Sequence, residues 1–147
     1  MEFADSIGQI LKQKGDVFSM PPSASVYDAV VCMAEKGVGA LLVMEDGKVV
    51  GILSERDYAR KIVIKGRNSK DTPVHEIMSS PVIFVTPQHT VGDCMRIITE
   101  KHIRHLPVMD GDRVIGVISI GDLVNWVMHA QRETIRHLES YITGMSS

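Results

Sequence analysis

The 147-residue sequence lacks several features that would assign it to a specialised class of protein. It has only two cysteines, Cys32 and Cys94, and both lie in apolar helical stretches where we expect buried, inert thiols. Its 16 lysines and arginines do not outnumber its 18 acidic residues, and the formal net charge of −2 argues against a nucleic-acid-binding protein. No run of 18 apolar residues is present, so we expect no transmembrane helix and no membrane partner.

Motifs of catalysis, metal binding and secretion are also missing. The first five residues show no basic segment followed by an apolar core, so we expect no signal peptide and a cytoplasmic location. Neither Gly-x-x-x-x-Gly-Lys nor Gly-x-Gly-x-x-Gly occurs, and no Ser/His/Asp arrangement follows a nucleophile elbow. His102 and His105 have no third ligand at suitable spacing on the same element, so we expect no metal site.

The sequence does contain an internal repeat with an offset of 65 residues. The segment 17–63 aligns without a gap on the segment 82–128, so that Ser54, for example, falls on Ser119. Each copy has only about 60 residues, a size at which a separate core is marginal. We therefore expect the two copies to pack on each other about a pseudo-twofold axis.

Each copy predicts the element order β-α-β-β-α, and the fold class is therefore α+β. Short apolar strands at 17–20 and 82–85 end before a proline. Capping boxes that begin at Ser25 and Thr90 open the first helix of each copy. A hairpin follows in each copy, with Asp-Gly in its turn, and the hairpin leads into a second helix.

The domain boundaries follow from this pattern. We expect a first repeat at 1–65, a polar linker at 66–73, a second repeat at 74–130 and a C-terminal helical extension at 131–147. The extension carries an apolar stripe that the repeat does not need, formed by Ile135, Leu138, Tyr141 and Ile142. Such a helix is marginal alone in water and needs a packing surface, so we expect a homodimer with the extension at or near the contact. The extension folding back on its own chain, or docking on a target protein, remains open.

One motif carries chemistry. Gly51-Ile-Leu-Ser54-Glu-Arg-Asp57 recurs as Gly116-Val-Ile-Ser119-Ile-Gly-Asp122, and in both copies a strand runs into a helix through Ser-x-x-Asp. The pattern can be a helix cap and nothing more. At the end of a strand, however, the helix N-terminus can also receive a phosphate, and the aspartate can accept the hydroxyl protons of a ribose.

These features together resemble a cystathionine-β-synthase-type (CBS) domain pair. They are the duplicated unit, the Asp-Gly hairpins, His-Leu-Pro-Val at 105–108 and the paired Gly-h-h-Ser-x-x-Asp segments, where h is apolar. The resemblance covers nearly the whole chain except the C-terminal extension, and it is to stand-alone proteins of bacterial type. It implies a regulatory module, not an enzyme, that binds an adenosine ligand (AMP, ADP, ATP or NAD) and acts on a separate, unidentified target protein.

The resemblance also implies the site residues. The serines of the motif would contact phosphate, and the aspartates would hold the ribose hydroxyls. The adenine would lie between the first strand of each copy and the segment entering its second strand. The nucleotide-binding residues predicted in this way are Ser54, Asp57, Ser119, Asp122, Arg56, Val17, Ala40, Val82, Arg104, His105 and Pro107. Arg56 could reach a further phosphate, or it could belong to a solvated basic helix face.

Two points remain open at this level. The two copies differ, since Ala40 in the first copy corresponds to His105 in the second, so we expect two inequivalent sites. The runner-up function is a structural or adaptor dimer that binds no nucleotide at physiological concentrations. A nucleotide hydrolase is disfavoured because no residue that would activate water is evident.

Overall fold

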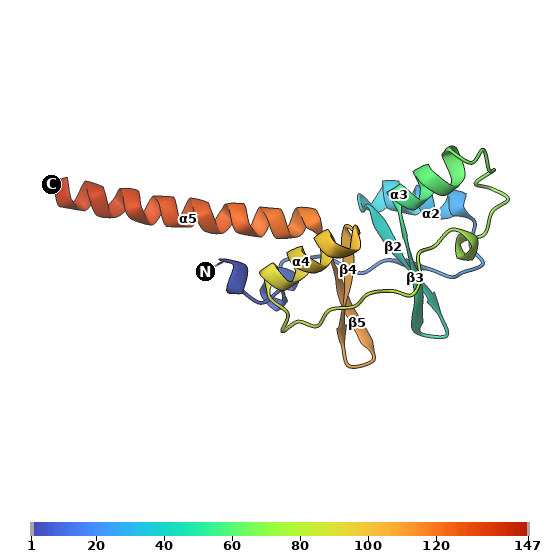
Figure 1. The fold of residues 1–147 in the computed structure, drawn as a ribbon, viewed down its shortest axis with the longest axis horizontal. Coiled ribbons are helices and arrows are strands. Elements are labelled where there is room, and N and C mark those ends of the chain that lie inside the picture. The colour runs from blue at the N-terminus through green and yellow to red at the C-terminus, as the bar shows by residue number, and fades with distance from the viewer. Residues whose placement is uncertain (1, 147) are drawn as a thin grey trace. The chain divides into compact units, whose positions relative to one another are not determined.

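The computed structural model describes residues 2–146, and its elements follow the duplicated order that the sequence predicts, except for the opening strand of the second repeat (Figure 1). In chain order the elements are η1 (Glu2–Ala4), α1 (Gly8–Leu11), β1 (Ser19–Met20), α2 (Val26–Lys36), β2 (Ala40–Glu45), β3 (Lys48–Ser54), α3 (Glu55–Tyr58), η2 (Ala59–Val63), η3 (Val74–Glu76), α4 (Val91–Lys101), β4 (His105–Asp110), β5 (Arg113–Ser119) and α5 (Ile120–Ser146). The predicted α+β tandem fold with an extended C-terminal helix is confirmed.

The chain folds into two compact units, and neither unit is a continuous stretch of sequence. One unit comprises Met1–Lys14, Val85–Val108 and Gly116–Ser147, and the other comprises Gly15–Phe84 and Met109–Ile115. The N-terminal segment of the chain therefore belongs with the body of the second repeat. The compact units do not coincide with the repeats as they are counted along the sequence.

A short segment precedes each repeat, and we name the two segments the first lead-in (residues 5–11) and the second lead-in (residues 72–78). The first lead-in bonds to the second repeat: Ile7 N–H donates to the carbonyl of His89 at 2.9 Å, and Gly8 N–H donates to that of Pro87 at 3.1 Å. The side chains of Ile7 and Ile10 are buried there. The first lead-in thus completes the core of the unit that holds the second repeat.

The second lead-in makes the equivalent contacts with the first repeat. Val74 N–H donates to the carbonyl of Ala24 at 2.8 Å, and His75 N–H donates to that of Pro22 at 3.0 Å. These acceptors are the repeat equivalents of the two acceptors that the first lead-in uses. The two lead-ins are therefore exchanged between the repeats in a symmetric manner.

The cores of the two units use matching positions of the repeat. Buried residues of the first repeat are Val26, Ala29, Met33, Leu41, Val43 and Leu53, and their equivalents in the second are Val91, Cys94, Ile98, Leu106, Val108 and Ile118, also buried. The helices α2 and α4 begin at Ser25 and Thr90, whose side chains accept the N–H groups of Asp28 and Asp93 at 3.0 Å. Both residues are confirmed as N-caps, but the complete capping box that the sequence predicts in each copy forms only at Thr90, whereas Ser25 caps its helix through the Asp28 N–H alone.

The predicted opening strands differ between the repeats. In the first repeat β1 is reduced to two residues and pairs in parallel with β2, helped by Leu42 N–H donating to the carbonyl of Phe18. In the second repeat the strand predicted at 82–85 is wrong, because only an isolated bridge between Val85 and Val108 forms. The position equivalent to Leu42 is Pro107, which has no N–H to donate, and this removes one ladder hydrogen bond.

Both hairpins form as predicted, and their turns differ. Asp46 and Gly47 both adopt positive φ, at 52° and 77°, as a type I′ turn between β2 and β3 requires. In the turn between β4 and β5 the positive φ falls on Gly111 alone. The one-residue shift of glycine between the two Asp-Gly sequences accounts for the difference.

The last helix, α5, is much longer than α3 and continues away from α4 in Figure 1. Its first turns are fixed to the rest of its unit by Leu123, which is fully buried, and by the indole N–H of Trp126, which donates to Asp5 at 2.9 Å. Within residues 2–146 no helix, α5 included, is both long and apolar enough to cross a membrane.

Candidate functional site

The first Ser-x-x-Asp corner lies where β3 runs into α3. Ser54 is the N-cap residue, and its backbone N–H and hydroxyl donate to Oδ2 of Asp57 at 3.0 and 3.1 Å. Asp57 N–H returns a hydrogen bond to the Ser54 hydroxyl at 3.2 Å. The local sequence therefore forms a complete capping box.

Asp57 is also engaged through its other carboxylate oxygen. Oδ1 accepts a hydrogen bond from the hydroxyl of Ser79 at 3.1 Å and pairs with the ammonium of Lys61, also at 3.1 Å. Lys61 in turn donates to the carbonyl of Ile77 at 2.9 Å. Asp57 is 9% exposed, and the four contacts match the roughly four acceptor positions of a carboxylate. A ribose hydroxyl could bond to Asp57 only by displacing one of these donors.

The second corner, between β5 and α5, has the same cap and a different environment. Ser119 N–H donates to Oδ2 of Asp122 at 2.8 Å, and Asp122 N–H donates to the hydroxyl of Ser119 at 3.1 Å. The ammonium of Lys14, just after the first lead-in, also bonds to Oδ2. None of these three bonds involves Oδ1 of Asp122. The second corner can therefore accept a hydroxyl proton without losing its cap.

Electrostatics keep Asp122 ionised. Partial burial by itself raises the pKa of this carboxyl, but the hydrogen bonds from Lys14 and from Ser119 and the charge of Lys14 outweigh it, so the pKa lies below its usual range. A carboxylate that is fully ionised at neutral pH accepts hydrogen bonds and donates none. This is the state that a ribose diol would require.

Backbone hydrogen bonds bring the strand-entry segments to both corners. Glu55 N–H, at the start of α3, donates to the carbonyl of Gly39 at 3.0 Å, and Ile120 N–H, at the start of α5, donates to that of Arg104 at 2.9 Å. Ala40 is the β-ladder partner of Ser54. The predicted grouping of these segments with the Ser-x-x-Asp corners is present in each copy.

The other predicted residues occupy different environments. Val17 and Arg56 are half-buried in the unit of the first repeat, and Arg104 is exposed at the start of β4. His105 is half-buried. Pro107 is buried in β4, and its carbonyl accepts a hydrogen bond from the N–H of Val85 at 3.0 Å. Val82 is half-buried and belongs to the compact unit that holds the first repeat, whereas His105 and Pro107 belong to the unit that holds the second.

Three residues at the corners escaped the sequence analysis. Lys14 lies 108 positions before Asp122, and no local pattern connects the two. Ser79 lies 22 positions after Asp57 and reaches it because the second lead-in packs on the first repeat. Lys61 did carry a signal, since it follows Asp57 by four positions on a helix, the spacing of an intrahelical ion pair.

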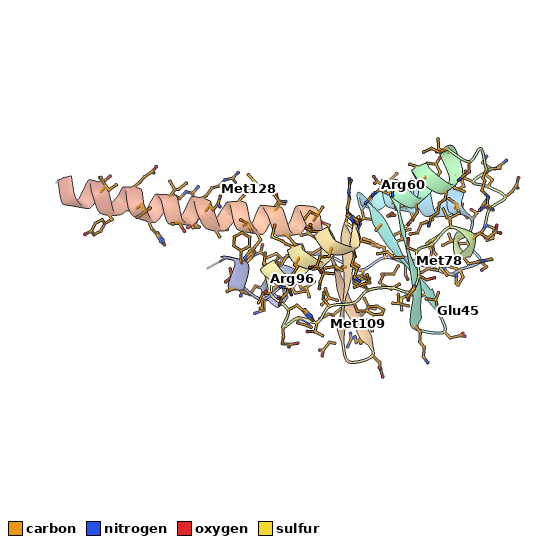
Figure 2. The ribbon with its side chains drawn as sticks, in the orientation of Figure 1. Glu45, Arg60, Met78, Arg96, Met109 and Met128 are labelled. Carbon is orange, nitrogen blue, oxygen red and sulfur yellow. The ribbon has the colours of Figure 1, made fainter. Side chains whose placement is uncertain are left out.

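The glycines of the two motifs make room for the lead-ins. A Cβ atom at Gly51 would overlap the side chain of Met78, which lies beside β3 in Figure 2, and one at Gly116 would overlap a methyl group of Leu11. Each motif glycine therefore admits a side chain at the end of the lead-in that packs on its repeat. This reason for the glycine was not evident from the sequence.

The cysteines and histidines form no further centre. Cys94 is fully buried, and burial, with a smaller effect of Asp93, raises the pKa of its thiol to about 11. Cys32 is half-buried, and neither cysteine forms a disulfide. Across residues 2–146 no group of three or more His, Cys, Asp or Glu side chains is placed to hold a metal ion.

Comparison with known proteins agrees with this architecture. The CBS-domain family profile matches residues 7–64 and 74–129. The chain is 45% identical over 125 residues to the mitochondrial CBS domain-containing protein CBSX3 of Arabidopsis thaliana, covering 82% of this chain and 61% of that protein. It is 32% identical over 107 residues to the CBS domain-containing protein YhcV of Bacillus subtilis, covering 73% and 76%. The chain thus spans less than two thirds of the plant relative.

Solved structures give the same assignment. A CBS-domain protein from Burkholderia ambifaria superimposes with a TM-score of 0.83 at 48% identity, covering 86% of this chain and 96% of that one. The family consists of regulatory modules that occur both alone and within larger proteins. The family profile matches both repeats, and the exchanged lead-ins and paired Ser-x-x-Asp corners agree with it. The chain therefore belongs to the CBS-domain family and carries a tandem pair of CBS domains.

Proposed function

We propose that this CBS pair is a sensor that binds an adenosine-containing ligand, AMP, ADP, ATP or NAD, and passes the bound state to a separate target protein. The observation that carries the proposal is the second corner. There an ionised carboxylate has one oxygen, Oδ2, held by its cap and by Lys14, and its other oxygen, Oδ1, takes part in neither of these contacts. A pair of ribose hydroxyls needs an acceptor of this kind.

The helix that begins at Ser119 supports the same corner as a phosphate site. α5 has 27 residues, so the partial positive charge at its N-terminus is fully developed, whereas α3 has only four residues before the backbone changes to the π-helical segment η2. A phosphate near the Ser119 hydroxyl would meet a hydroxyl donor and a helix N-terminus together. Arg104 lies exposed at the adjacent strand entry and adds positive charge.

The two corners are therefore unequal in the proposal. Asp122 with Ser119 forms the principal ribose and phosphate site. Asp57 with Ser54 binds more weakly, because a ligand there must displace a donor from a carboxylate whose acceptor positions are filled. We expect calorimetric titration to give one site per chain of high affinity, or two sites of distinct affinity.

The decisive experiment compares ribonucleotides with their 2′-deoxy forms. Removing a hydroxyl that bonds to a carboxylate costs about 1.5–3 kcal/mol, so dATP or dAMP should bind on the order of 10- to 100-fold more weakly than its ribose form. Asp122→Asn should lose most of this discrimination, because a neutral amide is a poorer acceptor. Asp57→Asn, the matched control, should keep it.

Two results would reject the proposal. No heat and no thermal shift with any of the four ligands would favour the structural or adaptor dimer without nucleotide binding. Equal affinity for ribose and deoxyribose forms would remove the role of Asp122 even if the chain binds nucleotides. A saturating ligand at one hundred times its Kd should stabilise the fold by about 2.7 kcal/mol, which a thermal shift assay detects readily.

A further inference from the structure

The second half of α5 carries an apolar face that its own unit leaves largely open. Ile135, Leu138 and Ile142 are 53%, 57% and 64% exposed, and Val124 and Met128, nearer the start of the helix, are 40% and 45% exposed. Met128 is labelled on α5 in Figure 2. Buried residues on the same helix, such as Leu123, lie on the neighbouring face that packs on the rest of the unit. The exposed face is therefore a second surface of α5.

The exposed residues follow a strict heptad spacing. Steps of four and three residues connect Val124, Met128, Gln131, Ile135, Leu138 and Ile142, and we name this set the α5 seam. Met128, Ile135 and Ile142 take the a positions, and Val124, Gln131 and Leu138 take the d positions. Apolar a and d positions repeated every seven residues form the contact row of a coiled coil. A single polar residue in such a row restricts the registers that the two helices can adopt.

Two charges beside the seam select its partner. Arg132 and Glu139 occupy successive e positions, are both exposed, and lie seven residues apart with opposite charge. When two identical helices pair antiparallel, the e positions of one helix lie beside the e positions of the other. In a parallel pair they lie beside the g positions, which here are the uncharged Val127, Thr134 and Tyr141. The two charges therefore complement a second copy of the same helix in the antiparallel orientation.

We propose that the α5 seam binds the α5 seam of a second copy of this chain as an antiparallel coiled coil. In this register Ile135 faces the partner's Leu138, and Gln131 faces the partner's Ile142. Arg132 lies beside the partner's Glu139, and the symmetry of the pair makes this contact twice. The contact is separate from the Ser-x-x-Asp corners and requires no ligand.

Cysteine cross-linking tests the pairing and its orientation in the full-length chain. The double variant Gln131→Cys and Ile142→Cys should form disulfide-linked dimers under mild oxidation, because these two positions face each other. They cannot link within one chain, since eleven helical residues separate them by about 16 Å. Ile142→Cys alone should cross-link no more than the wild type, whose Cys32 and Cys94 provide the background.

The cross-linking results are read on a denaturing gel without reductant. A double variant that links no more than the wild type would overturn the seam contact. Efficient linking of Ile142→Cys alone would overturn the antiparallel orientation, because these residues are adjacent only in a parallel pair. Linking of the double variant alone would support both parts of the proposal.

Charge reversal provides a second test, measured as the dimer dissociation constant by analytical ultracentrifugation. Arg132→Glu places like charges together at both contacts and should weaken the dimer on the order of tenfold. Adding Glu139→Arg in the same chain restores two opposite-charge contacts and should recover the affinity. A double variant as weak as the single variant would overturn the charge pairing.

A seam substitution with a matched control addresses the apolar contact. Leu138→Glu should shift the mass from that of two 16.2 kDa chains toward one at micromolar concentration, whereas Ser140→Glu, which puts the same charge outside the seam, should not. A wild-type mass of one chain at all concentrations would overturn the proposal and favour a target protein or the chain's own surface as the occupant. Far-UV circular dichroism checks that both variants keep their helix content.

Discussion

The four S/T-x-x-Asp sequences of this chain have the same local pattern and unequal surroundings, so replacing each aspartate by alanine should destabilise the fold to different degrees. We expect the loss to be largest for Asp57, smaller for Asp122, and smallest for Asp28. Asp28 is exposed, and its contribution to the cap is only the N–H that it donates to Ser25 at 3.0 Å, which alanine keeps. Asp28→Ala is therefore the matched control.

The magnitude for Asp57 follows from its contacts. Loss of the capping box costs about 1 kcal/mol. The hydroxyl of Ser79, an exposed residue, loses its charged acceptor in a part-buried hydrogen bond, which costs about 1.5 kcal/mol. The pair with Lys61 adds no more than about 1 kcal/mol, since the lysine side chain is 42% exposed. Asp57→Ala should therefore lose about 3 kcal/mol.

Asp122 loses less. Its cap is again worth about 1 kcal/mol. Its pair with Lys14 is partly exposed on both sides and adds at most about 1 kcal/mol. The expected total of about 1.5 kcal/mol corresponds to a fall in Tm of roughly 3–6 °C, against roughly 6–12 °C for Asp57→Ala, in a protein of this length.

Urea unfolding followed by circular dichroism measures these losses directly, and Tm by calorimetry checks them. Equal losses for Asp57→Ala and Asp122→Ala would refute the argument that the first carboxylate is structurally saturated. A loss for Asp28→Ala as large as that for Asp57→Ala would show that the local pattern, rather than the surroundings, sets the contribution. Either result would also remove the physical basis for ranking the two corners as ligand sites.

Three further predictions concern the lead-ins and the thiols. Lys14→Met should raise the pKa of Asp122, which NMR titration of its carboxyl carbon would show. Because Lys14 lowers the pKa of this carboxyl in the folded wild type, the wild type should be more stable than the variant at neutral pH. This difference in stability should disappear as the pH falls through the lowered pKa. Gly51→Ala should destabilise more than Gly116→Ala in urea, because the first new methyl group meets several atoms of a methionine side chain and the second meets mainly one terminal methyl; equal losses would contradict this. Cys94, buried with a thiol pKa of about 11, should react with a disulfide reagent at pH 8 only on unfolding, and a rapid reaction of the C32S variant would contradict this.

Much of the fold was predictable because the repeat doubles every local signal. The caps at Ser25 and Thr90, the Asp-Gly turns and the apolar helix faces appear twice in the sequence, and the structure confirms them in both copies. The sequence analysis predicted a strand at 82–85 that does not form, although the residue that prevents it, Pro107, is visible in the sequence. The prediction considered only the apolar character of residues 82–85 and overlooked that Pro107, in the neighbouring strand, has no N–H to donate.

The site was predictable in part for a similar reason. The strand-to-helix corners at Ser54 and Ser119 follow from local spacing, and both form. The inequality of their aspartates does not follow from local spacing, because it depends on Lys14 and Ser79, which reach the corners from distant parts of the chain. Only the three-dimensional packing of the lead-ins places these donors, so the sequence could identify the acceptors and not their partners.

The exchanged lead-ins determine where this chain can be divided. A fragment that ends at residue 65, at the end of the first repeat, would keep a lead-in whose acceptors, Pro87 and His89, are absent, and would lack the lead-in that bonds to Pro22 and Ala24. A fragment of residues 15–84 would contain matched donors and acceptors despite crossing the repeat boundary. One repeat with its own lead-in is thus half of a swapped pair. Duplication within one chain makes that exchange permanent, because each half of the gene encodes a segment that the other half needs in order to fold.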